Sequence, residues 1–153
     1  MTSTGSDDSA PDLAGYYPAW LNHLAEDVTL EGSMMDGYVQ GPEAVRTVLV
    51  HIRSLYDYQD FHAVGPFAAD GWFEDYTAGV RGEPISNFTM VTRNAAGQTQ
   101  HVVGNYRPRS TLLLLSRLIG GKLAGTPYAG HFVAPESRKG HTRDRRTQLQ
   151  DDV

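Results

Sequence analysis

The stretch from Gly71 to Arg81 alternates in the way that is typical of a β-strand with one side facing a protein interior. Two aromatic residues and a carboxylate fall on the first side, which consists of Trp72, Glu74, Tyr76, Ala78 and Val80. The other side consists of Phe73, Asp75, Thr77 and Gly79. A carboxylate between inward-facing aromatic residues lies either at an exposed strand end or in a pocket, and the rest of the chain favours a pocket.

Several other segments have strand character and are separated by turn residues. The predicted strands run from Val28 to Met34, Phe61 to Phe67, Pro84 to Arg93 and Gln98 to Arg107. Glycine, proline and asparagine mark turns at 68–71, 81–84 and 94–97. The last four strands are therefore expected to pair as successive antiparallel hairpins.

Apolar residues recur at helical spacing in two earlier segments. A short helix is predicted over 11–25, with its regular part beginning at Pro18, and a second over 41–58, which Gly41-Pro42-Glu43 opens. A third apolar segment, 111–123, has the length of a helix, although Gly120-Gly121 weakens it. Its four consecutive leucines cannot all lie on one buried side of a helix, so some of them must contact another surface. The segment could act as a lid, as a dimer contact or as a membrane-surface contact.

Helix, strand, helix and then four strands joined by hairpins indicate an α+β fold. A strongly curved antiparallel sheet can wrap around the N-terminal helices and enclose a cone-shaped pocket. We expect one domain over 11–133. The polar segments 1–10 and 134–153 are expected to be disordered tails.

Composition narrows the classes of partner and chemistry. With 153 residues, 40% of them hydrophobic, the chain fits one globular domain. Its net charge of −5 argues against nucleic acid or an anionic membrane as the main partner, and the acidic residues interspersed in the basic tail argue the same. There is no cysteine, no paired histidine motif and no phosphate-binding glycine loop, so no metal or cofactor is expected. The absence of an apolar leader predicts a cytoplasmic protein.

Glu74 is the strongest candidate for acid/base chemistry, because a partly buried carboxyl among aromatic residues has a raised pKa. Tyr76 shares its side and is placed to hydrogen-bond a substrate oxygen. His62, on the preceding strand, forms a His–Glu couple only if the strand register puts both on one face. In the competing interpretation, the Glu74 side chain is exposed to water or pairs with a basic residue, and His62 is a surface residue.

Four aromatic residues are candidates to line the pocket and hold a flat, mostly hydrophobic ligand: Tyr17, Trp20, Trp72 and Tyr106. The alternative is that they fill the core, which we favour for Trp20 taken alone because helical stripes are usually core.

One motif resembles a known family. The segment Trp20-Leu21-Asn22-His23-Leu24-Ala25-Glu26-Asp27-Val28-Thr29-Leu30-Glu31-Gly32, followed by Gly41-Pro42-Glu43-Ala44-Val45-Arg46, resembles the nuclear transport factor 2-like superfamily and its SnoaL-like members. The resemblance covers about residues 12–107. It implies the cone-shaped fold and dimers formed through the sheet. Relatives include ketosteroid isomerases, polyketide cyclases, epoxide hydrolases, dehydratases and plain binding or transport proteins.

The register of that resemblance implies further pocket residues and one departure. Asn87 and Thr89 would face the pocket from the fourth strand of the sheet, and Gln100 and Tyr106 from the last. The catalytic aspartate of ketosteroid isomerases would fall at Gly32, which cannot abstract a proton, and their second pocket acid near Thr89. Both substitutions argue against that mechanism.

The resulting prediction is a SnoaL-like, homodimeric protein that binds a small hydrophobic, polycyclic molecule and acts on it as an isomerase, cyclase or hydrolase. The alternative is a non-catalytic ligand-binding or dimerisation module whose pocket is filled by side chains. Neither nucleic acid nor a membrane is an expected partner.

Overall fold

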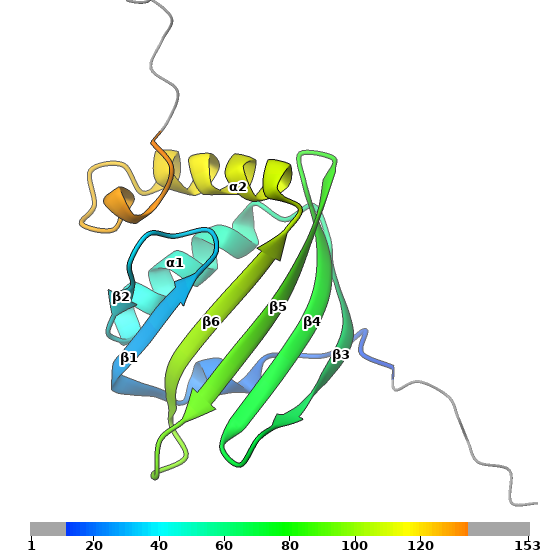
Figure 1. The fold of residues 1–153 in the computed structure, drawn as a ribbon, viewed down its shortest axis with the longest axis vertical. Coiled ribbons are helices and arrows are strands. Elements are labelled where there is room, and N and C mark those ends of the chain that lie inside the picture. Colours follow the sequence, from blue (N-terminus) through cyan, green and yellow to red (C-terminus); the bar gives the residue numbers. More distant parts are fainter. Residues whose placement is uncertain (1–11, 135–153) are drawn as a thin grey trace, which may run out of the picture.

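The computed structural model of the protein describes residues 12–134 (Figure 1). The predicted tails, 1–10 and 134–153, lie outside this range apart from Ala134. The elements in chain order are the 3₁₀ helix η1 (Ala19–Asn22), β1 (Leu24–Gly32), β2 (Val39–Gln40), α1 (Pro42–Ser54), β3 (Gln59–Phe67), β4 (Gly71–Val80), β5 (Glu83–Arg93), β6 (Thr99–Arg107), α2 (Arg109–Lys122) and the 3₁₀ helix η2 (Ala129–His131).

The six strands form one curved sheet in the order β2-β1-β6-β5-β4-β3. Figure 1 shows α1 lying against one face of this sheet and α2 crossing one of its ends. The predicted α+β class, with a curved sheet wrapped over a helix, is confirmed. The sheet differs from a purely antiparallel one in a single pairing, because β1 runs parallel to β6. That pairing joins two strands that are far apart in the sequence. It has no connecting turn that the sequence could reveal, so the parallel pairing was not predicted.

The predicted first helix over 11–25 is wrong. Only the short turn η1 is helical there, and the chain is already extended in β1 from Leu24 onward. The strand pairs with β2 on one side and β6 on the other. Those backbone hydrogen bonds outweigh the weak helical preference that the spacing of apolar residues indicated.

The core lies between α1 and the concave face of the sheet. Val45, Val48 and Ile52 recur on the inward side of α1 and are buried against strand residues such as Val28 and Val102. Glycine at 41 precedes the helix with a φ of 98°, and Pro42 occupies its first turn, as predicted.

Helix α2 continues through Gly120 and Gly121, contrary to the weakening we expected. A β-carbon on Gly120 would meet the Val133 carbonyl oxygen at 2.9 Å, so this glycine allows the C-terminal segment to pack closely on the helix. Leu115 is fully buried, while Leu112 and Leu114 pack partly against the core. Neither α2 nor α1, among the residues described, is long and apolar enough to cross a membrane.

Two glycines face each other where β1 meets β6. Gly32 pairs with Gly104, and a β-carbon on Gly32 would lie 2.2 Å from the Gly104 carbonyl oxygen. That distance is far inside van der Waals contact, so no side chain fits at 32 unless the backbone moves. The position where the family resemblance would put a catalytic base therefore has no room for one.

We predict that Gly32→Ala destabilises the protein by about 1–3 kcal/mol, because it overpacks a fixed backbone contact. Chemical denaturation measures this loss. Gly121→Ala is the matched control: it has nothing within 4 Å of the added carbon and lies in a helix, so it should be neutral or slightly stabilising. Equal stabilities for the two variants would contradict the packing argument.

Candidate active site

Two rows of side chains cross the concave face of the sheet side by side. In the first row the paired positions run across four strands as Gly32, Gly104, Thr89 and Glu74. In the second row they run as Tyr106, Asn87, Tyr76 and Phe61. Because alternate residues of a strand face the same side, both rows point toward α1. Sheet geometry alone thus brings one carboxyl group and two phenols onto one wall.

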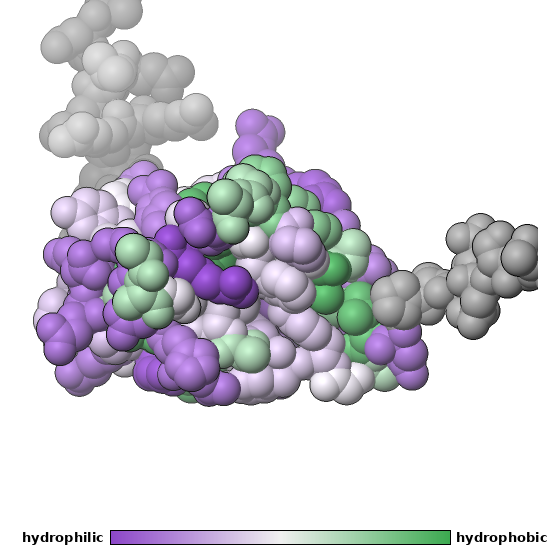
Figure 2. Space-filling model, turned by 90° about the horizontal axis from the view of Figure 1, so that it is seen from below, coloured by the Kyte–Doolittle hydropathy of each residue, from purple (hydrophilic) through white to green (hydrophobic). Residues whose placement is uncertain are grey.

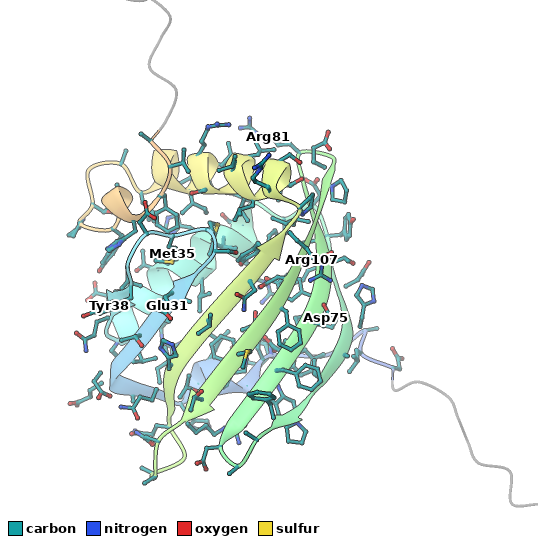
Figure 3. The ribbon with its side chains drawn as sticks, in the orientation of Figure 1. Glu31, Met35, Tyr38, Asp75, Arg81 and Arg107 are labelled. Carbon is teal, nitrogen blue, oxygen red and sulfur yellow. The ribbon has the colours of Figure 1, made fainter. Side chains whose placement is uncertain are left out.

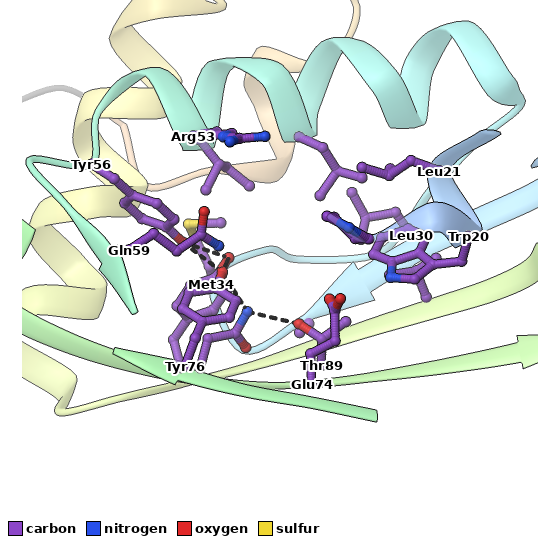
Figure 4. A pocket seen from close by; sticks show the side chains of 18 of the residues that line it. Trp20, Leu21, Leu30, Met34, Arg53, Tyr56, Gln59, Glu74, Tyr76 and Thr89 are labelled. Atoms are coloured by element: carbon purple, nitrogen blue, oxygen red, sulfur yellow. Dashed lines mark hydrogen bonds between the residues drawn. The ribbon is translucent and has the colours of Figure 1, made fainter. Parts of the chain in front are cut away.

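These rows line a partly open cavity of about 90 Å³ (Figure 4). Its opposite wall comes from Trp20 and Leu21 around η1 and from Leu49, Ile52 and Arg53 of α1. A site that encloses a drug-sized ligand typically measures roughly 300–1,000 Å³. The cavity by itself therefore has room for a small group, and the polycyclic ligand stays a prediction.

Three tyrosine hydroxyls meet at one end of the cavity. The Tyr56 hydroxyl lies 2.8 Å from that of Tyr76 and donates to that of Tyr106 at 3.2 Å. The Asn87 amide nitrogen donates to the Tyr76 hydroxyl at 2.8 Å. Burial raises the pKa of all three phenols, so each keeps its proton and remains a hydrogen-bond donor. Together Tyr56, Tyr76 and Tyr106 form the tyrosine cluster.

Glu74 occupies the other part of the wall, where only 2% of its surface is exposed. Its carboxylate accepts a hydrogen bond of 2.5 Å from the Tyr16 hydroxyl, which in turn accepts one of 2.9 Å from the Trp72 indole. Loss of solvation raises the pKa of Glu74, while the hydrogen bond from Tyr16 and the nearby indole N–H of Trp20 oppose the shift. No lysine or arginine within the described residues forms an ion pair with it.

Two buried polar atoms on the cavity wall have no hydrogen-bond partner within residues 12–134. They are the indole nitrogen of Trp20 and the side-chain oxygen of Asn87. Exchanging the two ends of the amide would leave the same position without a partner. The Trp20 N–H lies near the Glu74 carboxylate, so the Asn87 oxygen is the atom left without any partner in the described part of the chain. Unpaired buried polar groups are rare and costly, so this oxygen indicates a polar donor or ordered water in the cavity.

An outer groove of about 600 Å³ adjoins the cavity. The two spaces share four wall residues: Arg53, Tyr56, Gln59 and Phe61. Tyr16 lines the groove on one side and hydrogen-bonds Glu74 on the other, and its ring meets that of Phe61 edge-on at 4.7 Å. Tyr16 therefore separates the groove from the carboxyl group.

Six of the residues singled out from the sequence line the cavity: Glu74, Tyr76, Trp20, Asn87, Thr89 and Tyr106. Trp72 lies directly behind them, against Tyr16.

The structure corrects three placements. Tyr17 is 51% exposed, because the helix expected to turn it inward is absent. His62 is the extra residue of a bulge in β3, and its ring contacts Thr77 on the outer side of the sheet, 2.8 Å away. Gln100 is likewise skipped by the β5–β6 pairing and donates to Asp27.

Two residues that help to form the site, Tyr16 and Tyr56, were not predicted from the sequence. Tyr16 lies outside any predictable pattern, because it precedes η1 in an irregular segment. Tyr56 follows the end of α1 at the spacing of its buried residues Val48 and Ile52, which indicates an inward direction but not a hydrogen-bonding role for its hydroxyl.

Comparison with solved structures identifies the fold. A steroid delta-isomerase from Pseudomonas aeruginosa superposes with a TM-score of 0.64 at 20% identity, over 74% of this chain and 80% of that one. An uncharacterised protein with a cystatin-like fold from Silicibacter pomeroyi gives 0.63 at 19% identity, over 68% and 73%. An NTF-2 like protein of unknown function from Burkholderia xenovorans gives 0.50 at 11% identity, over 60% and 74%. The chain has the nuclear transport factor 2-like fold. No family model matches its sequence, and neither does any curated protein.

Within this nuclear transport factor 2-like fold, the chain supplies its acid from β4 rather than from β1. Gly32 lines the cavity but carries no functional group, whereas Glu74 lies at the opposite end of the same row. In residues 12–134 no three histidine or acidic side chains are grouped so that they could hold a metal ion. The most buried polar groups on the wall are the Glu74 carboxyl and neutral hydrogen-bond donors, while Glu31 and Arg53 add charged side chains to the lining.

We predict that Glu74→Gln stabilises the protein at neutral pH. A carboxyl whose pKa is higher in the folded state binds a proton more tightly there, so wild-type stability falls as pH rises past the unfolded value. The gain from the glutamine should therefore shrink as pH is lowered toward 4. Thermal melts across pH 4–8 measure it, with the exposed Glu26→Gln as control. A pH-independent effect would contradict the assignment.

Tyr16→Phe should raise the pKa of Glu74 further, because the substitution removes a hydrogen bond that favours the charged carboxylate. Carbon-13 NMR titration of the Glu74 carboxyl carbon measures this pKa directly. Tyr17→Phe alters the adjacent exposed tyrosine, whose hydroxyl reaches only Asn22 at 3.4 Å, and should leave the titration unchanged. A lower or unaltered pKa in Tyr16→Phe would show that the hydrogen bond is not formed.

Proposed function

We propose that the protein is an isomerase-type enzyme that moves a proton on a small carbonyl compound held in the cavity. The observation that carries this proposal is the convergence of Glu74 and the tyrosine cluster on one buried wall. A desolvated carboxylate is a stronger base than one in water, and preorganised hydroxyl donors stabilise negative charge on oxygen.

The step uses both groups. The Glu74 carboxylate takes a proton from the carbon next to the carbonyl, and the electron pair of the broken C–H bond forms the carbon–carbon double bond of an enolate. Negative charge moves to the carbonyl oxygen, where the cluster hydroxyls donate hydrogen bonds to it. In a substrate that already has a carbon–carbon double bond at the β,γ position, this enolate is a dienolate, and the protonated Glu74 returns the proton to its γ-carbon. The double bond has then moved from the β,γ to the α,β position, and the carboxylate is regenerated.

The spacing of the two groups supports this division of labour. Glu74 and Tyr76 are alternate residues of β4 on one face, which separates their Cα atoms by roughly 6.6 Å. A carbonyl oxygen at Tyr76 therefore leaves its neighbouring carbon directed toward Glu74.

The cavity volume sets the size of the reacting part. About 90 Å³ accommodates a small ring or short chain, so a larger substrate would place its remaining atoms in the adjoining groove. The Pseudomonas protein with the same fold is described as a steroid delta-isomerase, which supports proton transfer as the reaction class. This chain would perform it with a carboxyl group in a different position.

Binding without turnover is the second candidate. It is favoured by the hydrogen bond that occupies Glu74, since a carboxylate held by Tyr16 is not free to approach a substrate carbon. The related idea of a dimerisation module rests on the leucine-rich segment 112–123, and the predicted homodimer rests on the sheet contact that the family resemblance implies. On the outer face of the sheet Phe73 and Phe88 stack at 5.5 Å. Figure 2 shows hydrophobic side chains in several patches among hydrophilic ones. The homodimer stays a prediction.

Hydrogen–deuterium exchange at the carbons next to a ketone tests catalysis without knowledge of the natural substrate. We expect the wild-type protein to accelerate exchange of cyclopentanone in D₂O, followed by proton NMR. Glu74→Gln should lose roughly 10²–10⁴-fold, the usual contribution of a general base. Tyr76→Phe should lose at least roughly tenfold, because the other cluster hydroxyls partly replace it.

Glu26→Gln, an exposed carboxylate on β1, serves as the control and should match wild type. Binding of cyclopentanone without any accelerated exchange would favour the non-catalytic candidate. Acceleration that persists in Glu74→Gln would show that another group is the base.

A further inference from the structure

Arg53 lies in the last turn of α1 and borders both the inner cavity and the outer groove. In Figure 4 its side chain extends from the helix over the space enclosed by the sheet. Among the residues that the structure describes, it is the only lysine or arginine on the wall of either space. A cation in this position meets anything that enters the cavity from the groove.

The guanidinium of Arg53 has no hydrogen-bond or ion-pair partner within residues 12–134. Some other cations of the described chain are engaged: Arg46 donates to the Leu21 carbonyl at 2.6 Å, and Lys122 donates to the Ser54 hydroxyl at 2.9 Å. Arg107 lies 3.9 Å from Asp75 on the outer face of the sheet (Figure 3). The remaining unpaired arginines of residues 12–134, which include Arg93 and Arg117, line neither the cavity nor the groove, so the position of Arg53 distinguishes it from them. Arg53 therefore keeps its planar set of five N–H donors available.

Two carboxylates, Asp12 and Asp60, also line the groove. Neither forms an ion pair with Arg53 within residues 12–134. Asp12 accepts a hydrogen bond from the Ala14 backbone N–H instead. Glu74 lies on the inner side of Tyr16. The Gln59 amide, in contrast, shares both spaces with Arg53 and adds a polar contact.

We propose that Arg53 binds a carboxylate on the ligand, so that the substrate is an amphipathic keto acid. Its carbonyl end would lie at the tyrosine cluster, and its carboxylate would lie at the mouth of the cavity beside Arg53 and Gln59. This inference rests on the proposed function and names its substrate class. A guanidinium pairs with a carboxylate through two parallel hydrogen bonds, which gives orientation as well as affinity.

The arrangement also assigns a direction to the ligand. Charge at the mouth keeps the carboxylate away from Glu74, whose own negative charge would repel it in the interior. The carbonyl carbon and its neighbours are then the only part of the molecule that reaches the catalytic wall. Arg53 is thus a specificity-determining residue for the proton transfer and takes no part in the step itself.

A matched pair of probes separates the carboxylate contact from binding of the ketone. Titration calorimetry with 4-acetylbenzoate and with its methyl ester compares an acid and a neutral molecule of the same skeleton. We expect wild-type protein to bind the acid roughly 10- to 100-fold more tightly than the ester, as for a hydrogen-bonded charged group. Arg53→Gln should abolish the preference. Higher salt should reduce it.

Arg93→Gln is the control, because Arg93 is exposed at the end of β5 and lines neither space. It should keep the full preference of wild type. Equal affinities of acid and ester for wild-type protein would overturn the role of Arg53 and leave the ketone site standing. A preference that survives in Arg53→Gln would overturn it too. Failure of both probes to bind would overturn the ketone site as well.

Discussion

Polar side chains on the concave face of the sheet lose their contact with water, and each must find a partner or weaken the fold. Phenol pairs with phenol in the tyrosine cluster, and the Glu74 carboxyl pairs with Tyr16. These contacts tie β4 and β6 to α1 and to the segment before η1. These hydrogen bonds offset the cost of burying polar groups in the interior. The same hydrogen bonds hold the candidate catalytic groups in place.

Space inside the cone comes from residues that lack a side chain. Gly32 lies against the Gly104 backbone, so glycine there allows β1 and β6 to approach closely, while the missing β-carbon of Gly104 leaves room beside Tyr106 and Asn87. The surrounding apolar residues close the rest of the volume. The result is a cavity large enough for a small carbonyl group and its neighbours, with the polar groove outside it.

Strand alternation placed Glu74 and Tyr76 on the inner wall, and the family resemblance implied Asn87, Thr89 and Tyr106 there. All five line the cavity, because hairpin registers are fixed by local turns and keep alternate residues on one face. The failures at His62 and Gln100 come from bulges, which add a residue and reverse the facing side without leaving a clear trace in the sequence.

Contacts between distant segments were beyond sequence reasoning for a different reason. The hydrogen bond from Tyr16 to Glu74 spans 58 residues, and the parallel β1–β6 pairing joins the two ends of the domain. Neither has a local pattern. The size of the cavity depends on how tightly many side chains pack around it, so the expected polycyclic ligand could not be checked against volume until the fold was known.

The most direct test of the account is a crystal structure of the protein with cyclopentanone bound. The account predicts electron density for the ketone inside the cavity, with its oxygen within hydrogen-bond distance of the Tyr76 or Tyr56 hydroxyl and a neighbouring carbon facing Glu74. Ketone bound only at the surface, or an oxygen directed away from the tyrosine cluster, would contradict it.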